Sequence, residues 1–171
     1  ADILLVVDDS CSMQDKQNAL ASNFTSFIQY AVAANVDYQI GVTTTTESLT
    51  ECVPGFGCVS VNSKGPAGHL VQDTQTMLKY VKPTTPAVSA VFGRLVNVGT
   101  DGSGVETPLA CATLALTPPV VSNENAGFVR TDANLAVVII SDATDQSTQP
   151  VSYYQNLLVN VKGFQRLSYF T

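Results

Sequence analysis

Two continuous apolar runs stand far apart in the chain, and each is followed by an acidic residue. The first covers residues 3–7 and leads into Asp8, and the second covers residues 135–140 and leads into Ser141 and Asp142. An apolar run without polar alternation is typical of a strand buried on both faces of a sheet. We therefore predict that both runs are central strands.

Helical and strand-like patterns alternate between and around these two runs. Apolar spacing and helix-opening residues predict helices over 15–34, from Pro83 and Pro86 to about 95, over 106–116, and from Pro150 to Gly163. Further strands are expected over 38–43, 69–72 (a short edge strand) and 167–171, and residues 47–68 read as a loop. This alternation predicts a single α/β domain over 1–171 with a mainly parallel sheet, whose ligands gather at the carboxyl ends of the strands.

Composition narrows the classes of function. The chain of 171 residues is 45% apolar and only 13% charged, which is typical of a packed globular domain. Its net charge of −6 and scattered basic residues argue against nucleic acid and anionic membranes as partners. No apolar run is long enough to span a bilayer, so no membrane insertion is expected.

The cysteines indicate an oxidising compartment. Cys52 and Cys58 bracket a turn made by Pro54 and two glycines, so a local disulfide is expected there. A zinc site would need further ligands nearby. The only histidine, His69, stands alone and reads as a surface or packing residue, which leaves no histidine to act as a catalytic base. Because disulfides persist in oxidising compartments, the expected Cys52–Cys58 disulfide favours an extracellular or cell-surface location.

The loop after the first buried run carries oxygen donors at a regular spacing. Asp8, Ser10 and Ser12 alternate along it, and Asp142 follows the second run. If the two strands are neighbours, two carboxylates and two hydroxyls face one point, which suits a hard divalent cation and leaves a coordination position open. Simple capping of the following helix is the alternative reading of this loop.

Residues 3–13 (Ile-Leu-Leu-Val-Val-Asp-Asp-Ser-Cys-Ser-Met) closely resemble the first strand and metal-ion-dependent adhesion site of von Willebrand factor A domains. Residues 137–142 resemble that family's fourth strand and third-loop aspartate. The resemblance implies a doubly wound, Rossmann-like fold. It also implies a magnesium or calcium ion held by Asp8, Ser10, Ser12 and Asp142, with the open position taken by a carboxylate of a partner protein.

The second loop departs from the family pattern, because no threonine fits cleanly before the helix that starts near Pro108. Counting back from that helix favours Ser103 as the metal ligand from this loop. Glu106 is the rival, while Thr107 and Thr100 are weaker candidates. A third carboxylate at the site would hold the metal more tightly and attract an acidic partner less. Glu106 could equally favour the helix N-terminus alone.

The resemblance also implies that the loop of Cys11 faces the second loop, and Cys111 lies one turn into the helix that follows the second loop. A disulfide between the two cysteines is therefore expected, with two buried thiols as the alternative. Family members carry further C-terminal elements beyond this point, so the fold is expected to be incomplete at the C-terminus, or completed by another segment or chain. Residues 102–109, residues 125–128 and the pair Ser141-Asp142 resemble the bacterial secreted or lipoprotein branch of the family.

Three functions compete on this reading. The first is a metal-dependent adhesion module that binds an acidic group of a protein partner. The second is a structural subunit of a surface filament or envelope assembly, stiffened by metal and disulfides. The third, a metal-assisted hydrolase, lacks an evident base or nucleophile, so the chain is not expected to be an enzyme.

Overall fold

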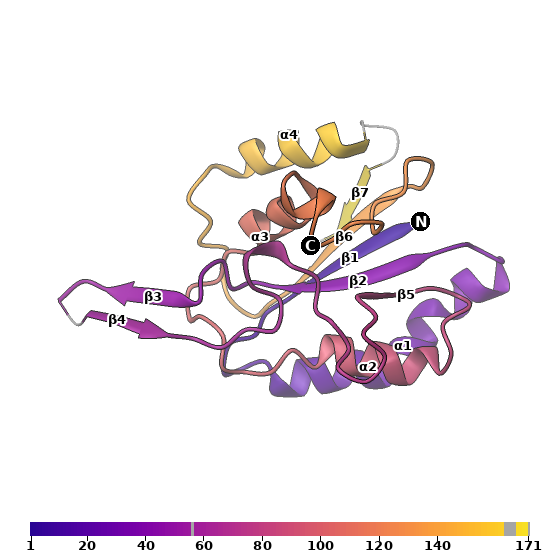
Figure 1. Ribbon diagram of the computed structural model, residues 1–171, viewed down its shortest axis with the longest axis horizontal. Helices are drawn as coiled ribbons and strands as arrows, with labels where there is room; N and C mark the ends of the chain where they lie inside the picture. The colour runs from indigo at the N-terminus through magenta and orange to yellow at the C-terminus, as the bar shows by residue number, and fades with distance from the viewer. Residues whose placement is uncertain (56, 163–166, 171) are drawn as a thin grey trace.

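A five-stranded, mostly parallel sheet forms the centre of the computed structural model, which describes residues 1–55, 57–162 and 167–170 (Figure 1). Its strand order is β5-β2-β1-β6-β7. The strands are β1 (Asp2–Val7), β2 (Gln39–Thr44), β5 (Tyr80–Val81), β6 (Leu135–Ile140) and β7 (Leu167–Phe170). Only β5 runs antiparallel to its neighbour. The expected α/β class and mainly parallel sheet are therefore confirmed.

The two apolar runs pair side by side as β1 and β6. Val7 lies opposite Ile140 on one side and opposite Thr44 of β2 on the other. All three strands thus end at the same edge of the sheet. The loops that begin at Asp8, Thr45 and Ser141 consequently start beside one another.

Helices cover both faces of the sheet. Helices α1 (Gln14–Ala33) and α2 (Val88–Val96) lie on one face, whereas α3 (Pro108–Leu116) and α4 (Val151–Lys162) lie on the other (Figure 1). Alternate β1 residues supply the two cores, with Leu5 and Val7 facing α1 and α2, and Leu4 and Val6 facing α3. Full burial on both faces explains why the β1 sequence shows no polar alternation.

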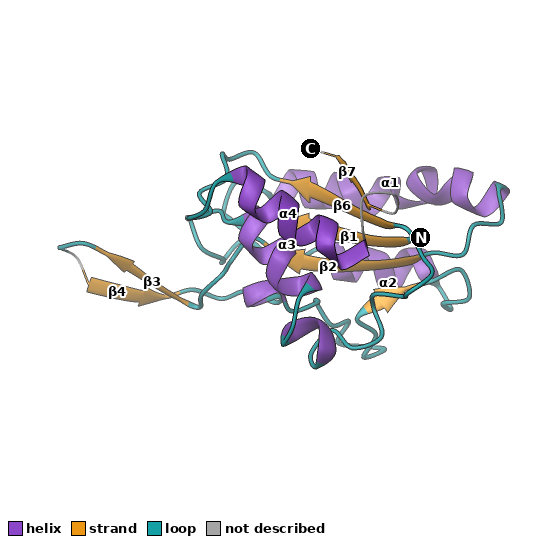
Figure 2. Ribbon diagram, turned by 90° about the horizontal axis from the view of Figure 1, so that it is seen from above, coloured by secondary structure: helices purple, strands orange, loops and turns teal. Residues whose placement is uncertain are grey.

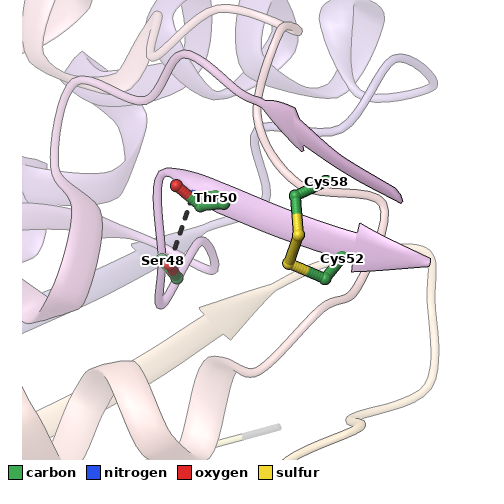
Figure 3. Close-up of a disulfide and its surroundings, with 4 residues drawn as sticks. All are labelled: Ser48, Thr50, Cys52 and Cys58. Atoms are coloured by element: carbon green, nitrogen blue, oxygen red, sulfur yellow. Dashed lines mark hydrogen bonds between the residues drawn. A yellow bond between two sulfur atoms is a disulfide. The ribbon is translucent and has the colours of Figure 1, made fainter. Parts of the chain in front are cut away.

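A two-stranded hairpin of β3 (Thr50–Val53) and β4 (Gly57–Ser60) projects well beyond the body of the domain (Figures 1 and 2). The expected disulfide between Cys52 and Cys58 is confirmed and joins the two strands across the hairpin, where these residues lie opposite each other (Figure 3). The expectation of a loop over 47–68 missed these strands, because the local signals there were those of the turn.

The expected edge strand at 69–72 is wrong, because β5 takes the edge of the sheet. Val71 donates one backbone hydrogen bond to Val42 O (2.7 Å), but no ladder follows. The next residue but one, Asp73, turns the chain instead, since its amide bonds Leu78 O and its carbonyl accepts from Met77 N. Two short 3-10 helices, η1 (Pro66–Gly68) and η2 (Val120–Ser122), complete the elements.

The expected helices are present with shifted ends. The helix expected from Pro83 starts at Val88, because Thr85 N bonds Lys82 O in a turn first. The predicted end at Gly163 and the last predicted strand residue, Thr171, lie outside the described residues. In the described ranges, no helix is both long and apolar enough to cross a bilayer.

Asn125 ties together segments that the sequence pattern leaves unconnected. Its fully buried side-chain amide donates to Gly68 O (2.8 Å) and Ala115 O (3.0 Å), and its Oδ1 accepts from Leu70 N (2.9 Å). One side chain thereby satisfies three buried backbone groups and anchors the segment after η1 to α3. Unpaired buried backbone groups are costly, which makes this residue a structural clamp.

We expect Asn125→Ala to lower the free energy of unfolding by about 3 kcal/mol, because it leaves three buried backbone groups unpaired. Urea denaturation followed by circular dichroism measures the effect. The exposed neighbour Asn123→Ala is the control and should stay close to wild type. Equal stabilities of the two variants would contradict the clamp.

Candidate metal site at the carboxyl edge of the sheet

Asp8 is fully buried at the end of β1 and joins two of the loops. Its Oδ1 accepts from the backbone amide of Ser10 (2.8 Å), and its Oδ2 accepts from Ser141 Oγ, at the end of β6 (2.6 Å). Since Asp8 N also bonds Ile140 O (3.0 Å), the carboxylate is held where the two central strands end.

Asp142 closes the same group from the other loop. Its Oδ1 accepts from Ser12 Oγ (3.0 Å), and its Oδ2 accepts from the ammonium group of Lys16 (2.7 Å), in the first turn of α1. The hydrogen bond from Lys16, followed by that from Ser12, lowers the pKa of Asp142. Residues 130 positions apart in the chain therefore meet through side chains.

The structure thus places the four predicted ligands at one edge of the sheet, in two contacting pairs. Asp8 contacts Ser10 and the β6 loop, and Ser12 contacts Asp142. Lys16 was not predicted as part of the site, because its sequence position is that of an ordinary surface residue on a helix.

Gln17, which links the first and second loops, was not predicted either. Its buried amide group donates to Asp8 O (3.0 Å) and to Gly99 O (2.8 Å), and its Oε1 accepts from Gly99 N (3.2 Å). A polar residue on the buried side of α1, one turn after Met13, was the only signal of this role. Gln17 fixes the glycine-rich loop against the end of β1.

Asp9 is a second fully buried acid beside the first. Its Oδ1 accepts from Thr46 Oγ1 (2.8 Å) and more weakly from Thr45 Oγ1 (3.4 Å), while its Oδ2 has no hydrogen-bond partner. Gly102 passes directly over it, and a Cβ there would lie 2.3 Å from Asp9 Cγ. Burial raises the pKa of Asp9.

Glu106 lies just before α3 and joins this buried group of acids. Thr45 Oγ1 donates to its Oε2, while its Oε1 is buried without a hydrogen-bond partner. Burial, together with the negative charges of Asp8, Asp9 and Asp142, raises the pKa of Glu106 to about 7, although the hydrogen bond from Thr45 lowers it. Its carboxylate is therefore electrostatically coupled to both ends of the predicted site.

Ser103 lies on the other side of the second loop, toward the hairpin. Its Oγ donates to Glu51 Oε2 (3.2 Å) and accepts from Val105 N (2.9 Å). Its amide donates to Thr46 Oγ1 (2.9 Å). The hydroxyl is thus engaged with the base of the hairpin, and its described contacts include none of Asp8, Ser10, Ser12 or Asp142. Of the other candidates, Thr107 donates its hydroxyl to Thr45 O (3.0 Å).

The donor set suits a hard cation, because it consists of carboxylates and hydroxyls. Among the described residues, no three His, Cys, Asp or Glu side chains are arranged to hold a metal by themselves, so serine hydroxyls would have to complete the coordination. The unpartnered oxygens of Asp9 and Glu106 are buried acceptors at this edge that a proton or a cation would satisfy. The residues therefore fit a divalent ion of the magnesium or calcium type.

The expected disulfide between Cys11 and Cys111 is wrong, because both cysteines are free. Cys11 is exposed on the first loop, whereas Cys111 points into the core from α3, with its Sγ 3.7 Å from Thr107 Oγ1. The first and second loops lie at the same edge of the sheet, but the two sulfurs do not meet because α3 directs the Cys111 side chain toward the sheet. The alternative of two buried thiols also fails, because only Cys111 is buried.

No protein-family model matches the chain, and no curated protein matches it significantly. The assignment of the site therefore depends on its motifs and on the contacts described above.

We expect thiol-labelling reagents to modify Cys11 rapidly and Cys111 only on unfolding. Cys11 is exposed, and burial raises the pKa of the Cys111 thiol to about 12, which suppresses the reactive thiolate. Labelling of native, unreduced protein followed by mass spectrometry measures both. A native protein without a reactive thiol would contradict the free state of Cys11.

We expect the metal-free protein to lose stability as pH rises through the range set by Glu106. A carboxyl group whose folded pKa is about 7, against an ordinary value of 4.5, keeps its proton longer in the folded state. The extra stability is fully present below pH 4.5 and is lost as the pH rises from 4.5 to about 7. Over this range the free energy of unfolding falls by up to about 1.4 kcal/mol per pH unit.

Urea denaturation in chelator between these pH values measures this slope, with Glu106→Gln as the comparison. The variant cannot ionise at this position, so the difference in stability between variant and wild type should grow with pH. A difference that is independent of pH would show that Glu106 is not the group responsible.

Proposed function

We propose that this chain is a metal-dependent adhesion module of the von Willebrand factor A type, which binds an acidic group of a partner protein through one divalent cation. The order of its elements and the helices on both faces of a mainly parallel sheet support the doubly wound form of that fold. The proposal includes an extracellular or cell-surface location, for which the exposed Cys52–Cys58 disulfide is supporting evidence.

One observation carries this proposal. Ser12 and Asp142 lie in hydrogen-bond contact at the point where two neighbouring parallel strands end, and Asp8 and Ser141 do the same (2.6 Å) beside them. Capping of α1 alone would explain the first loop but would not require acids and hydroxyls from the β6 loop to converge on it. Asp8, Ser10, Ser12 and Asp142 would hold the ion.

The second loop offers two donors, Ser103 and Glu106, and the contacts favour Glu106. Its Oε1 is buried and unpartnered near the other acids, whereas the Ser103 hydroxyl is engaged with Glu51 and Val105. We therefore propose Glu106 in place of the threonine of the family pattern. The additional carboxylate favours tight retention of the metal and reduces the pull of the bound ion on an acidic partner.

A structural role in a surface assembly is the second candidate, and the hairpin favours it. The disulfide-linked strands β3 and β4 project from the domain and pair only with each other among the described residues, with Val59 57% exposed. Unpaired strand edges can add a strand from another chain. The metal would then stiffen the base of the hairpin, through the second loop that Glu51 contacts.

Calorimetric titration of magnesium and of calcium into chelator-stripped protein tests the proposal. We expect wild type to bind one ion and Asp8→Asn to lose binding by at least about tenfold, because the variant removes a carboxylate charge where a hard cation needs it. The control is Glu124→Gln, which replaces an exposed acid in the segment between η2 and β6 and should bind like wild type.

The outcomes separate the two candidate functions. Metal binding by wild type that Asp8→Asn abolishes establishes the site, and a surface-bound screen of carboxylate-bearing proteins with and without chelator then tests adhesion. Absence of binding to wild type would remove the adhesion proposal and leave the metal-independent hairpin as the interacting part.

A further inference from the structure

Lys16 sits in the candidate site as a cation that belongs to the chain itself. Its ammonium group donates to Asp142 Oδ2 (2.7 Å) and to Ser12 O (3.0 Å), while Ser12 Oγ donates to the other oxygen of the same carboxylate (3.0 Å). The ammonium group therefore contacts two proposed metal ligands: the side chain of Asp142 and the main chain of Ser12.

The position of Lys16 is not explained by the helix that carries it. It lies in the first turn of α1, where the helix dipole disfavours a positive charge and favours an acid such as Asp15. A lysine there is stabilised by what lies opposite it, namely Asp142. The contact is thus with the site and not with the helix.

Lys16 differs from the other paired cations in that its partner is an acid of the candidate site. Asp8, Asp9, Glu106 and Asp142 gather at this edge of the sheet, and of the five ion pairs between described residues only that of Lys16 and Asp142 involves any of these acids. The other ion pairs use Asp2, Asp37 and Asp73 elsewhere. Lys16 therefore supplies the counter-charge that Asp142 has without a metal.

We propose that Lys16 is an internal competitor for the metal, whose ammonium must leave Asp142 before that carboxylate can serve a divalent ion. This inference depends on the proposed function of the site. Lys16 then weakens metal binding while it holds Asp142 and Ser12 in place when no metal is bound. Because the contact is half-exposed, its effect is moderate and is screened by salt.

Titration of magnesium into chelator-stripped Lys16→Met tests this competition. Methionine keeps the unbranched chain but removes the charge, so we expect affinity to rise about three- to tenfold at low ionic strength and less at 0.5 M salt, where screening is stronger. Lys16→Arg retains the charge and should stay within about twofold of wild type. Lys82→Met, which removes an exposed charge after β5, controls for net charge and should also resemble wild type.

A second measurement uses the metal-free state. We expect Lys16→Met to lower the melting temperature in chelator relative to Lys82→Met, and excess magnesium to reduce or abolish that difference. Nuclear magnetic resonance of the Lys16 side chain should show its ε-methylene signal shifting as magnesium is added to wild type.

The outcomes distinguish this inference from the proposed function. Binding to wild type with unchanged affinity in Lys16→Met overturns the competition but leaves the metal site standing. Binding only after Lys16→Met supports the competition strongly. An absence of binding in every variant overturns both the competition and the metal site, whereas weaker binding in Lys16→Met would show that Lys16 assists the metal and would overturn the competition alone.

Discussion

The parallel pairing of β1 between β2 and β6 sets where each loop of the candidate site begins. Because Val7 lies opposite both Thr44 and Ile140, three loops start at one edge of the sheet, and the strand register alone brings their polar side chains close to one another. A shift of one residue in either register would turn the strand faces over and separate the acids. The buried alternation of Leu4 to Val7 between two cores holds this register, so the packing of the core also positions the site.

That edge gathers several acidic side chains of a domain in which only 13% of the residues are charged. Asp8 and Asp9 are fully buried, Glu106 nearly so, and two of their oxygens have no hydrogen-bond partner. Hydroxyl groups of Thr45, Thr46 and Ser141 supply part of the solvation that water would give. Buried carboxylates need a proton or a cation to balance them, and this need is the physical link between the fold and the proposed metal chemistry.

The hairpin gives the site a neighbour that lies outside the core. Glu51 at its base accepts from Ser103 Oγ (3.2 Å) and more weakly from Gly104 N (3.4 Å), so hydrogen bonds connect the second loop to the hairpin. The disulfide between Cys52 and Cys58 keeps the two strands together without help from the sheet. A binding partner at the carboxyl edge would therefore contact both the loops of the candidate metal site and the hairpin on one side of the domain.

The class of fold, both central strands, the local disulfide and four candidate ligands (Asp8, Ser10, Ser12 and Asp142) could be predicted from the amino-acid sequence, because burial periodicity and short motifs depend on neighbouring residues. The remaining features became visible only in the packed chain. Tertiary packing placed Glu106 among the acids and Ser103 against the hairpin, turned Cys111 away from Cys11, and brought Lys16 onto Asp142 across 126 positions. These outcomes depend on how helices rotate and where loops close over a sheet, and no local pattern records the direction of a side chain relative to a distant segment.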